Sequence, residues 1–356
     1  MPLPRHNQDF AKRLLGTVAG LSLSACSTLG YYGHIAHGEY AMLASRQPIT
    51  RVLADPNADT ALKARLRNAL DARSFASDKL GLPRNASYTG YTDLKRPYAT
   101  WNVFAAPEFS VDAHEQCYPL VGCLAYRGYF ERARADDEAA QLRARGLDVW
   151  IGGSAAYSTL GWFADPILNT MLRWTDDELV ATIFHELAHQ RLFVKGDTEF
   201  NESFASFVQY EGLHQWRAAK SLPDSDDAQR MRDSEFETLV LATRDRLRGV
   251  YASPLSDAAK RDRKRAEFER LRSDYARLRD TQWGGRGDYD GWIAAELNNA
   301  TLLPLGLYHR WVDAFTRLFA QCARDWPAFY AAAAQIGRLD PAKRAQALTT
   351  LQSTSP

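Results

Sequence analysis

The amino-acid sequence predicts an α+β protein that is mainly helical, and three observations support this class. Apolar residues recur at helical spacing through residues 175–216 and again through 290–350. Residues 84–163 are rich in Tyr, Trp, Val and Gly, with prolines between them, which is typical of strands and loops. Residues 224–283 carry two apolar stripes on either side of Pro254, so we expect a long helical hairpin with solvated outer faces. The fold should therefore hold one small mixed sheet.

The amino terminus reads as a bacterial lipoprotein signal. Basic residues precede a short apolar run, residues 14–23, which is below the ~20 residues that a membrane-spanning helix needs. The tetrapeptide Leu-Ser-Ala-Cys that follows looks like a lipobox, so residues 1–25 would be removed and Cys26 acylated. An ordinary secretory signal or a buried helix are the alternatives. Because Ser27 and not Asp follows the cysteine, we expect a lipid anchor on the periplasmic side of the outer membrane, with the inner membrane as the alternative.

The composition excludes some partners and suggests how the chain is divided. The formal net charge is +1, which argues against nucleic acid as a partner. After the signal peptide, we expect an anchor and helical segment (26–83), an α/β core (84–223), the charged hairpin (224–283), a C-terminal helical segment (284–350) and a disordered tail (351–356).

Individual elements follow from the local patterns. We expect helices over 27–50, 56–80 and 131–145, and strands at 101–104, 109–111 and 149–151. Residues 152–160 precede the helix that carries the His-Glu-Leu-Ala-His motif, residues 185–189, and could form either an edge strand or part of a core hairpin.

The cysteines are few, and two of them suggest a local crosslink. Cys117 and Cys123 flank a five-residue loop, and an oxidising periplasm would permit a disulfide between them. Two free thiols or a soft metal site are the alternatives. Cys322 stands in an apolar setting and is expected to be an inert buried thiol.

The motif His-Glu-Leu-Ala-His, residues 185–189, is the most informative feature of the chain. Positions i and i+4 of a helix lie on one face, so His185 and His189 can reach one metal ion. Thr175 and Glu178 form a capping box at the start of this helix, and Gly196 is well placed to stop it. The alternative is a surface helix with two unrelated histidines.

A second helix should supply the remaining ligand. It would be capped by Asp197 or Thr198 and would run to about Trp216, with Glu202 near its start. Three protein ligands and one open position are typical of a hydrolytic zinc (Zn2+) site. We therefore expect His185, His189 and Glu202 to bind zinc, and Glu186 to take a proton from water.

These residues support a family resemblance. The stretch from His185 to Gly212, with Asn-Glu-Ser-Phe-Ala in its second helix, resembles the gluzincin metallopeptidases. Nearly the whole mature chain is similar to the bacterial "predicted aminopeptidase" lipoproteins, which implies the same ligands, Glu186 as the base and peptides as substrates. Two features depart from the large aminopeptidases: the spacing from His189 to Glu202 is shorter, and the Gly-x-Met-Glu-Asn motif that holds a substrate's amino terminus is missing.

Other candidates complete the hypothesis. An oxyanion donor could be Tyr308 or, as second choice, Tyr157. An acid that holds a substrate's ammonium group could be Glu296, Asp165 or Asp112. The sequence thus predicts a zinc aminopeptidase. The alternatives are a zinc endopeptidase, and a lipoprotein that binds peptide or envelope components and keeps a residual metal site.

Overall fold

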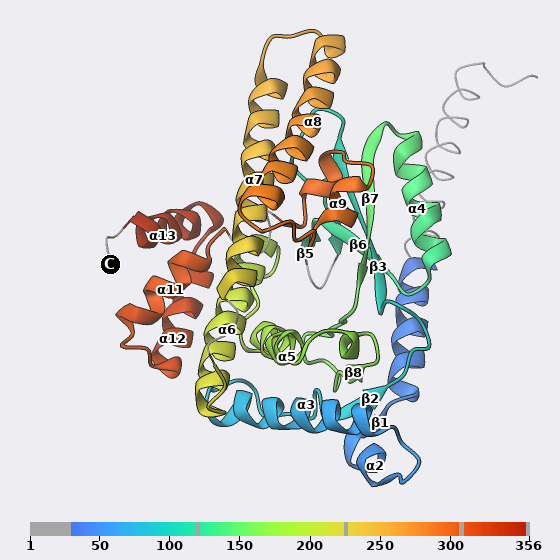
Figure 1. Cartoon of the computed structure of the whole chain (residues 1–356), viewed down its shortest axis with the longest axis vertical. Coiled ribbons are helices and arrows are strands. Elements are labelled where there is room, and N and C mark those ends of the chain that lie inside the picture. Colours follow the sequence, from blue (N-terminus) through green and yellow to red (C-terminus); the bar gives the residue numbers. More distant parts are fainter. Residues whose placement is uncertain (1–29, 119–121, 224–226, 306–309, 354–356) are drawn as a thin grey trace, which may run out of the picture. The chain divides into compact units, whose positions relative to one another are not determined.

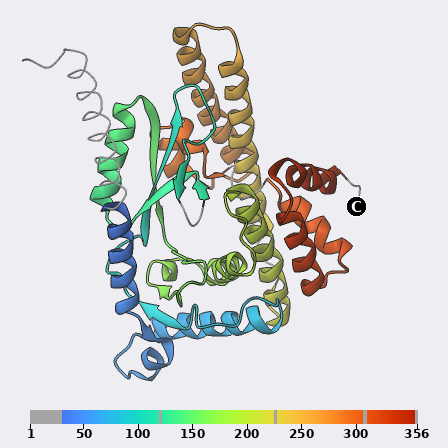
Figure 2. The same ribbon diagram turned by 180° about the vertical axis from the view of Figure 1, so that it is seen from behind.

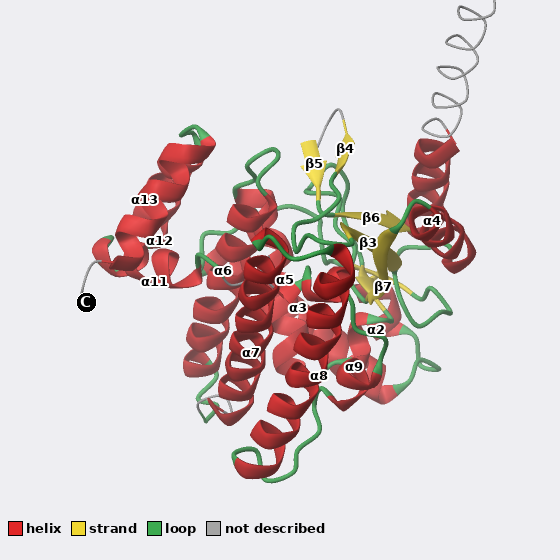
Figure 3. Cartoon of the chain, turned by 90° about the horizontal axis from the view of Figure 1, so that it is seen from above, coloured by secondary structure: helices red, strands yellow, loops and turns green. Residues whose placement is uncertain are grey.

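A computed structural model describes residues 30–118, 122–223, 227–305 and 310–353. The chain divides into two compact units, Met1–Arg46 and Gln47–Pro356. In the first unit, residues 30–44 form a helix, while Cys26 lies outside the described residues. The second unit is α+β and mainly helical, which confirms the predicted class (Figures 1 and 3). Within the described ranges, no helix is both long and apolar enough to cross a membrane.

Strand β3 (Thr100–Pro107) is the centre of an antiparallel sheet, with β6 (Tyr126–Tyr129) on one side and β7 (Leu147–Ser154) on the other. The strands predicted at 101–104 and 149–151 are confirmed. The strand predicted at 109–111 is wrong, because Ser110 N–H donates to the Pro107 carbonyl in a turn and Phe109 and Val111 instead pack into the hairpin core.

Alternation along the strands gives this sheet two different faces. Phe104 and Ala106 pack against Ala300 and Leu303, in and just after the 3-10 helix η2 (Asn299–Leu302). The opposite face meets helix α4 (Arg132–Ala144), whose Glu138 accepts a hydrogen bond from Tyr129 (Figure 2). The helix predicted over 131–145 is therefore confirmed.

Strand β7 lies at the edge of this sheet, but it ends at Ser154, so the edge strand expected over 152–160 extends only to 154. Beyond Ser154, side chains form hydrogen bonds with backbone groups that would otherwise be free to pair with another strand. The Thr170 hydroxyl donates to the Ala155 carbonyl at 2.5 Å, and Asp165 accepts from the Thr159 N–H at 3.1 Å. Residues 155–163 therefore form a tethered loop.

Two smaller sheets and two helices complete the amino-terminal half of this unit. Strand β2 (Gly90–Thr92) pairs with β1 (Gln47–Pro48) and with β8 (Ile167–Leu168). A hairpin of β4 (Gln116–Tyr118) and β5 (Gly122–Leu124) places Cys117 opposite Cys123, and the two form a disulfide with a Cα–Cα distance of 3.8 Å. The helices of this half are α2 (Ile49–Ala54) and α3 (Thr60–Asp78), followed by the 3-10 helix η1 (Met171–Arg173).

Helices α5 (Asp176–Arg191) and α6 (Thr198–Ala219) form the centre of the unit, and α6 is packed on several faces. Its aromatic stripe, Phe200, Phe204 and Phe207, packs against α11 (Val312–Gln321) and α12 (Trp326–Gly337). Cys322, just after α11, is a free thiol and is only partly buried. Helix α13 (Pro341–Ser353) ends the described chain and occupies residues 351–353 of the expected tail.

The hairpin predicted for 224–283 is present as α7 (Asp227–Ala252) and α8 (Asp257–Thr281), followed by the short α9 (Asp290–Ala294). Phe236, Val240 and Leu247 of α7 pack with Phe268 and Leu271 of α8 in a buried core. The opposite side of α7 is mostly polar and lines a cavity together with residues of α6.

Candidate metal centre

Helix α5 positions both histidines and Glu186. The Thr175 hydroxyl accepts from the Glu178 N–H, and the Glu178 carboxylate accepts from the Thr175 N–H, so the predicted capping box is confirmed. His185 and His189 are buried one turn apart on the same face. The helix ends at Arg191, before Gly196, which adopts a positive φ of 76° in the connection to α6.

The connection between the two helices is fixed by one side chain. The Asn201 amide accepts from the Val194 N–H at 2.7 Å and donates to the Val194 carbonyl at 2.8 Å. Asp197 caps α6 by accepting from the Phe200 N–H. Together these bonds set where α6 begins, and the next residue, Glu202, then faces α5.

Three ligand atoms converge on one point. Nε2 of His185 lies 3.1 Å from Nε2 of His189 and 3.2 Å from a carboxylate oxygen of Glu202, and the third separation, His189 to Glu202, is 3.6 Å. Ligand atoms at the usual zinc bond lengths of a tetrahedral site are about 3.3 Å apart. This group can therefore hold a metal ion with no rearrangement of the backbone.

The chemistry of the donors fits a cation as well. Nδ1 of His185 lies 3.0 Å from Oε1 of Gln209, and a carbonyl oxygen only accepts, so the imidazole donates from Nδ1. Nε2 then carries a lone pair beside the Glu202 carboxylate, and either a proton or a metal ion between the two atoms offsets their repulsion. A hydrogen bond that fixes the outer nitrogen is the usual support of a metal-binding histidine.

The buried charges of this group are strongly coupled. Burial by itself would raise the pKa of Glu202, but the charge of His189 and hydrogen bonds from both histidines outweigh it and hold the pKa well below its usual range. Burial would likewise lower the pKa of His189, and the neighbouring Glu202 charge reverses this and raises it. Glu202 thus remains an anion at neutral pH, as a metal ligand must.

Glu186 lies beside this group in an open cleft of about 410 Å³. The cleft is lined by α5 with Thr182, His185 and Glu186, by α6 with Ser206, Gln209 and Tyr210, and by the end of β7. Gly153 and Ser154 bring the sheet edge to the cleft, where an extended peptide could pair with it. Among the described lining residues, Glu186 is the only carboxylate.

The other described candidates do not line this cleft. Tyr308 lies outside the described residues, and the Tyr157 ring packs on Phe130. Asp165 is fully buried and accepts hydrogen bonds from Thr159; burial raises its pKa to about 6, more than these bonds lower it. The other two proposed acids are exposed, Glu296 beyond α9 and Asp112 near Arg248.

Two residues of the cleft were not predicted from the sequence. Gln209 and Tyr210 follow Glu202 by seven and eight residues, so they return to the same side of α6 two turns later. That spacing was the available signal, but an amide and a phenol are common on buried helix faces and carry no specific motif.

Most of the chain matches one known family. No curated protein and no solved structure matches it. The sequence model of the family described as "Putative aminopeptidase" matches residues 30–348, which include α5, α6 and the three converging ligands. The chain therefore belongs to this aminopeptidase family.

Proposed function

We propose that the protein is a zinc-dependent peptidase, and that its activity is that of an aminopeptidase, as the description of its family suggests. The observation that carries the proposal is the convergence of His185, His189 and Glu202 with Glu186 beside them at an open cleft. A structural zinc site usually closes its fourth position with Cys or His, and apart from the ligand His185 the described cleft residues supply neither.

The residues of the site would divide the reaction between them. When bound, zinc supplies a Lewis acid that activates water and polarises a carbonyl. Glu186 would accept the proton of the attacking water and return it to the leaving amine. Gln209 would keep the His185 ring in the required tautomer, and the end of β7 would align the peptide backbone.

The test is the hydrolysis of peptides by Glu186→Gln. Loss of a general base should reduce kcat by about 10²–10⁴-fold. Zinc content should stay at the parent value, because the ligands are intact. Glu211→Gln, a matched change on α6 at a residue that accepts a hydrogen bond from Gln215, should retain activity. Equal activity in Glu186→Gln and the parent would exclude the catalytic role.

An endopeptidase is the second candidate, and one observation favours it. An aminopeptidase needs a carboxylate or carbonyl against the substrate's ammonium group, whereas Glu186 is the only carboxylate among the described cleft residues. An amino-acid anilide and its amino-terminally acetylated form separate the two activities. Faster cleavage of the free amine supports the aminopeptidase, and faster cleavage of the blocked form supports the endopeptidase.

We further propose a lipid anchor at Cys26 on the periplasmic side of the outer membrane. Support comes from the lipobox-like sequence and from Ser27 after the cysteine. An acylated cysteine would hold the peptidase at a membrane surface, since each buried methylene adds about 0.8 kcal/mol.

A further inference from the structure

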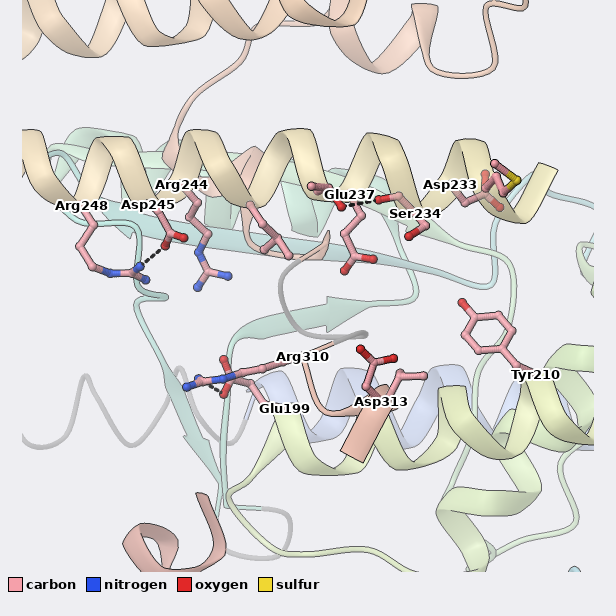
Figure 4. A pocket seen from close by; sticks show the side chains of 14 residues that line it. Glu199, Tyr210, Asp233, Ser234, Glu237, Arg244, Asp245, Arg248, Arg310 and Asp313 are labelled. Carbon is pink, nitrogen blue, oxygen red and sulfur yellow. Dashed lines mark hydrogen bonds and ion pairs between the residues drawn. The ribbon is translucent and has the colours of Figure 1, made fainter. Parts of the chain in front are cut away.

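A second and larger cavity, of about 1120 Å³, lies between α6 and α7 (Figure 4). Its walls are the polar stripe of α7, the outer side of α6 and residues 310–313. Tyr210 lines both this cavity and the metal cleft, so the two spaces adjoin at this side chain.

The cations of this cavity differ in how they are paired. The Arg310 guanidinium lies 2.7 Å from Glu199, and that of Arg248 lies 2.6 Å from Asp245. Arg244 points into the cavity (Figure 4), and its Nε donates to the Val111 carbonyl at 3.3 Å. No described carboxylate forms an ion pair with Arg244.

Arg244 carries its charge in a buried position, and a bound anion would offset the cost of that burial. Burial and then the charge of Arg248 lower the pKa of its guanidinium, and together they outweigh the more distant carboxylates of Glu199, Asp112 and Asp245, which raise it. An arginine remains protonated in proteins, so such a site carries a cation at a cost. A planar carboxylate that accepts two of its N–H groups would offset that cost.

The other charges of the cavity decide which anion fits. Three arginines face five carboxylates in the lining, a difference of −2, so a dianion such as phosphate would be repelled. Glu237 and Asp313 lie on opposite walls between Arg244 and Tyr210 (Figure 4). A single carboxylate is repelled less than a dianion, and a peptide that also carries a positive charge, such as its terminal ammonium group, suits this arrangement.

Resting on the proposed peptidase function, we propose that Arg244 binds the carboxyl terminus of short peptide substrates, whose remaining residues extend along the cavity to Tyr210 and the metal cleft. Asp233, which lies near Tyr210 in Figure 4, and Arg244 are eleven residues apart on α7, which corresponds to about 16 Å. An extended peptide spans that length with about five residues at ~3.4 Å each.

The experiment measures binding and not turnover. Pentaalanine with a free carboxyl terminus and pentaalanine amide are titrated calorimetrically into the zinc-loaded Glu186→Gln protein. The free acid should bind about 10- to 100-fold more tightly than the amide, as expected for a charge-assisted pair. Adding Arg244→Gln should abolish that difference, whereas Arg248→Gln, which removes a cation already paired with Asp245, should change it by less than about threefold.

Each outcome decides the question. Equal binding of acid and amide, no binding of either peptide, or equal loss in both arginine variants would overturn the proposal. Equally tight, Arg244-dependent binding of tetraalanyl-glutamate amide would show a site for any carboxylate and overturn the assignment to the carboxyl terminus. Acid-selective, Arg244-dependent binding by a protein that hydrolyses no peptide would reject the peptidase function alone.

Discussion

Gln209 offers the sharpest test of how the metal centre is built. Gln209→Met removes the acceptor that holds Nδ1 of His185 at 3.0 Å, and it keeps a side chain of similar length. The imidazole N–H then loses its hydrogen bond to Gln209, and the ring can adopt the other tautomer, in which Nε2 carries a proton and cannot bind metal.

The expected size of the effect follows from the nature of this bond. An ordinary neutral hydrogen bond contributes about 0.5–1.5 kcal/mol. Loss of a bond that supports a metal-binding histidine typically weakens metal affinity by about 10- to 100-fold, or roughly 1.4–2.7 kcal/mol. The larger range applies here, because the bond fixes a tautomer as well as a position.

The assay is a zinc titration against a competing chelator of known affinity. Gln215→Met is the control: this residue lies on the same helix and bonds Glu211 and Trp326, with no link to the ligands. It should leave zinc affinity within about twofold of the parent. Unchanged zinc affinity in Gln209→Met would refute the role of Gln209.

Three further perturbations test other parts of the structure. Asp165→Asn should remove a pH dependence of the free energy of unfolding. In the parent, the raised pKa of about 6 in the folded protein contributes about 2–3 kcal/mol of stability below pH ~4, and this contribution is lost as the pH rises through 6. Urea unfolding at several pH values measures the difference. Gly212→Ala should cost about 1–2 kcal/mol, because its Cβ would meet Leu80 at 2.8 Å and Phe184 at 2.9 Å; Gly249→Ala, with no atom within 4 Å, should stabilise slightly. Cys26→Ala should move the protein from the membrane fraction to the soluble fraction.

A different result would contradict each of these three predictions. Parallel pH profiles of Asp165→Asn and the parent would contradict the buried-carboxylate argument. Equal melting shifts in the two glycine variants would show that α5 and α6 can separate at no cost. Membrane retention of Cys26→Ala after a high-salt wash would mean that another anchor exists.

The candidate metal centre could be predicted because its information is local. The i, i+4 histidines and the capping box at Thr175 each depend on a few neighbouring residues of one helix. Glu202 depends only on the short connection that Asn201 holds in place. Local patterns of this kind can be recognised without knowing how the rest of the chain folds.

The cavity beside the metal cleft could not be predicted for the opposite reason. It exists because α7 lays a polar stripe along α6, and the sequence shows that stripe only as a solvated face of a charged hairpin. The end of β7 was misplaced for a related reason: side chains as distant as Thr170 and Asp165 compete for the backbone groups of residues 155–159. Contacts between distant segments leave no periodic pattern.

The central claim is that His185, His189 and Glu202 form one zinc site. Native mass spectrometry of the parent and of Glu202→Ala, each equilibrated at the same buffered free zinc, measures it directly. We predict one zinc per chain in the parent and loss of most of it in Glu202→Ala, since two histidines alone leave the ion with half of its usual ligands. A parent that binds no zinc, or a Glu202→Ala protein that retains it fully, would contradict the account.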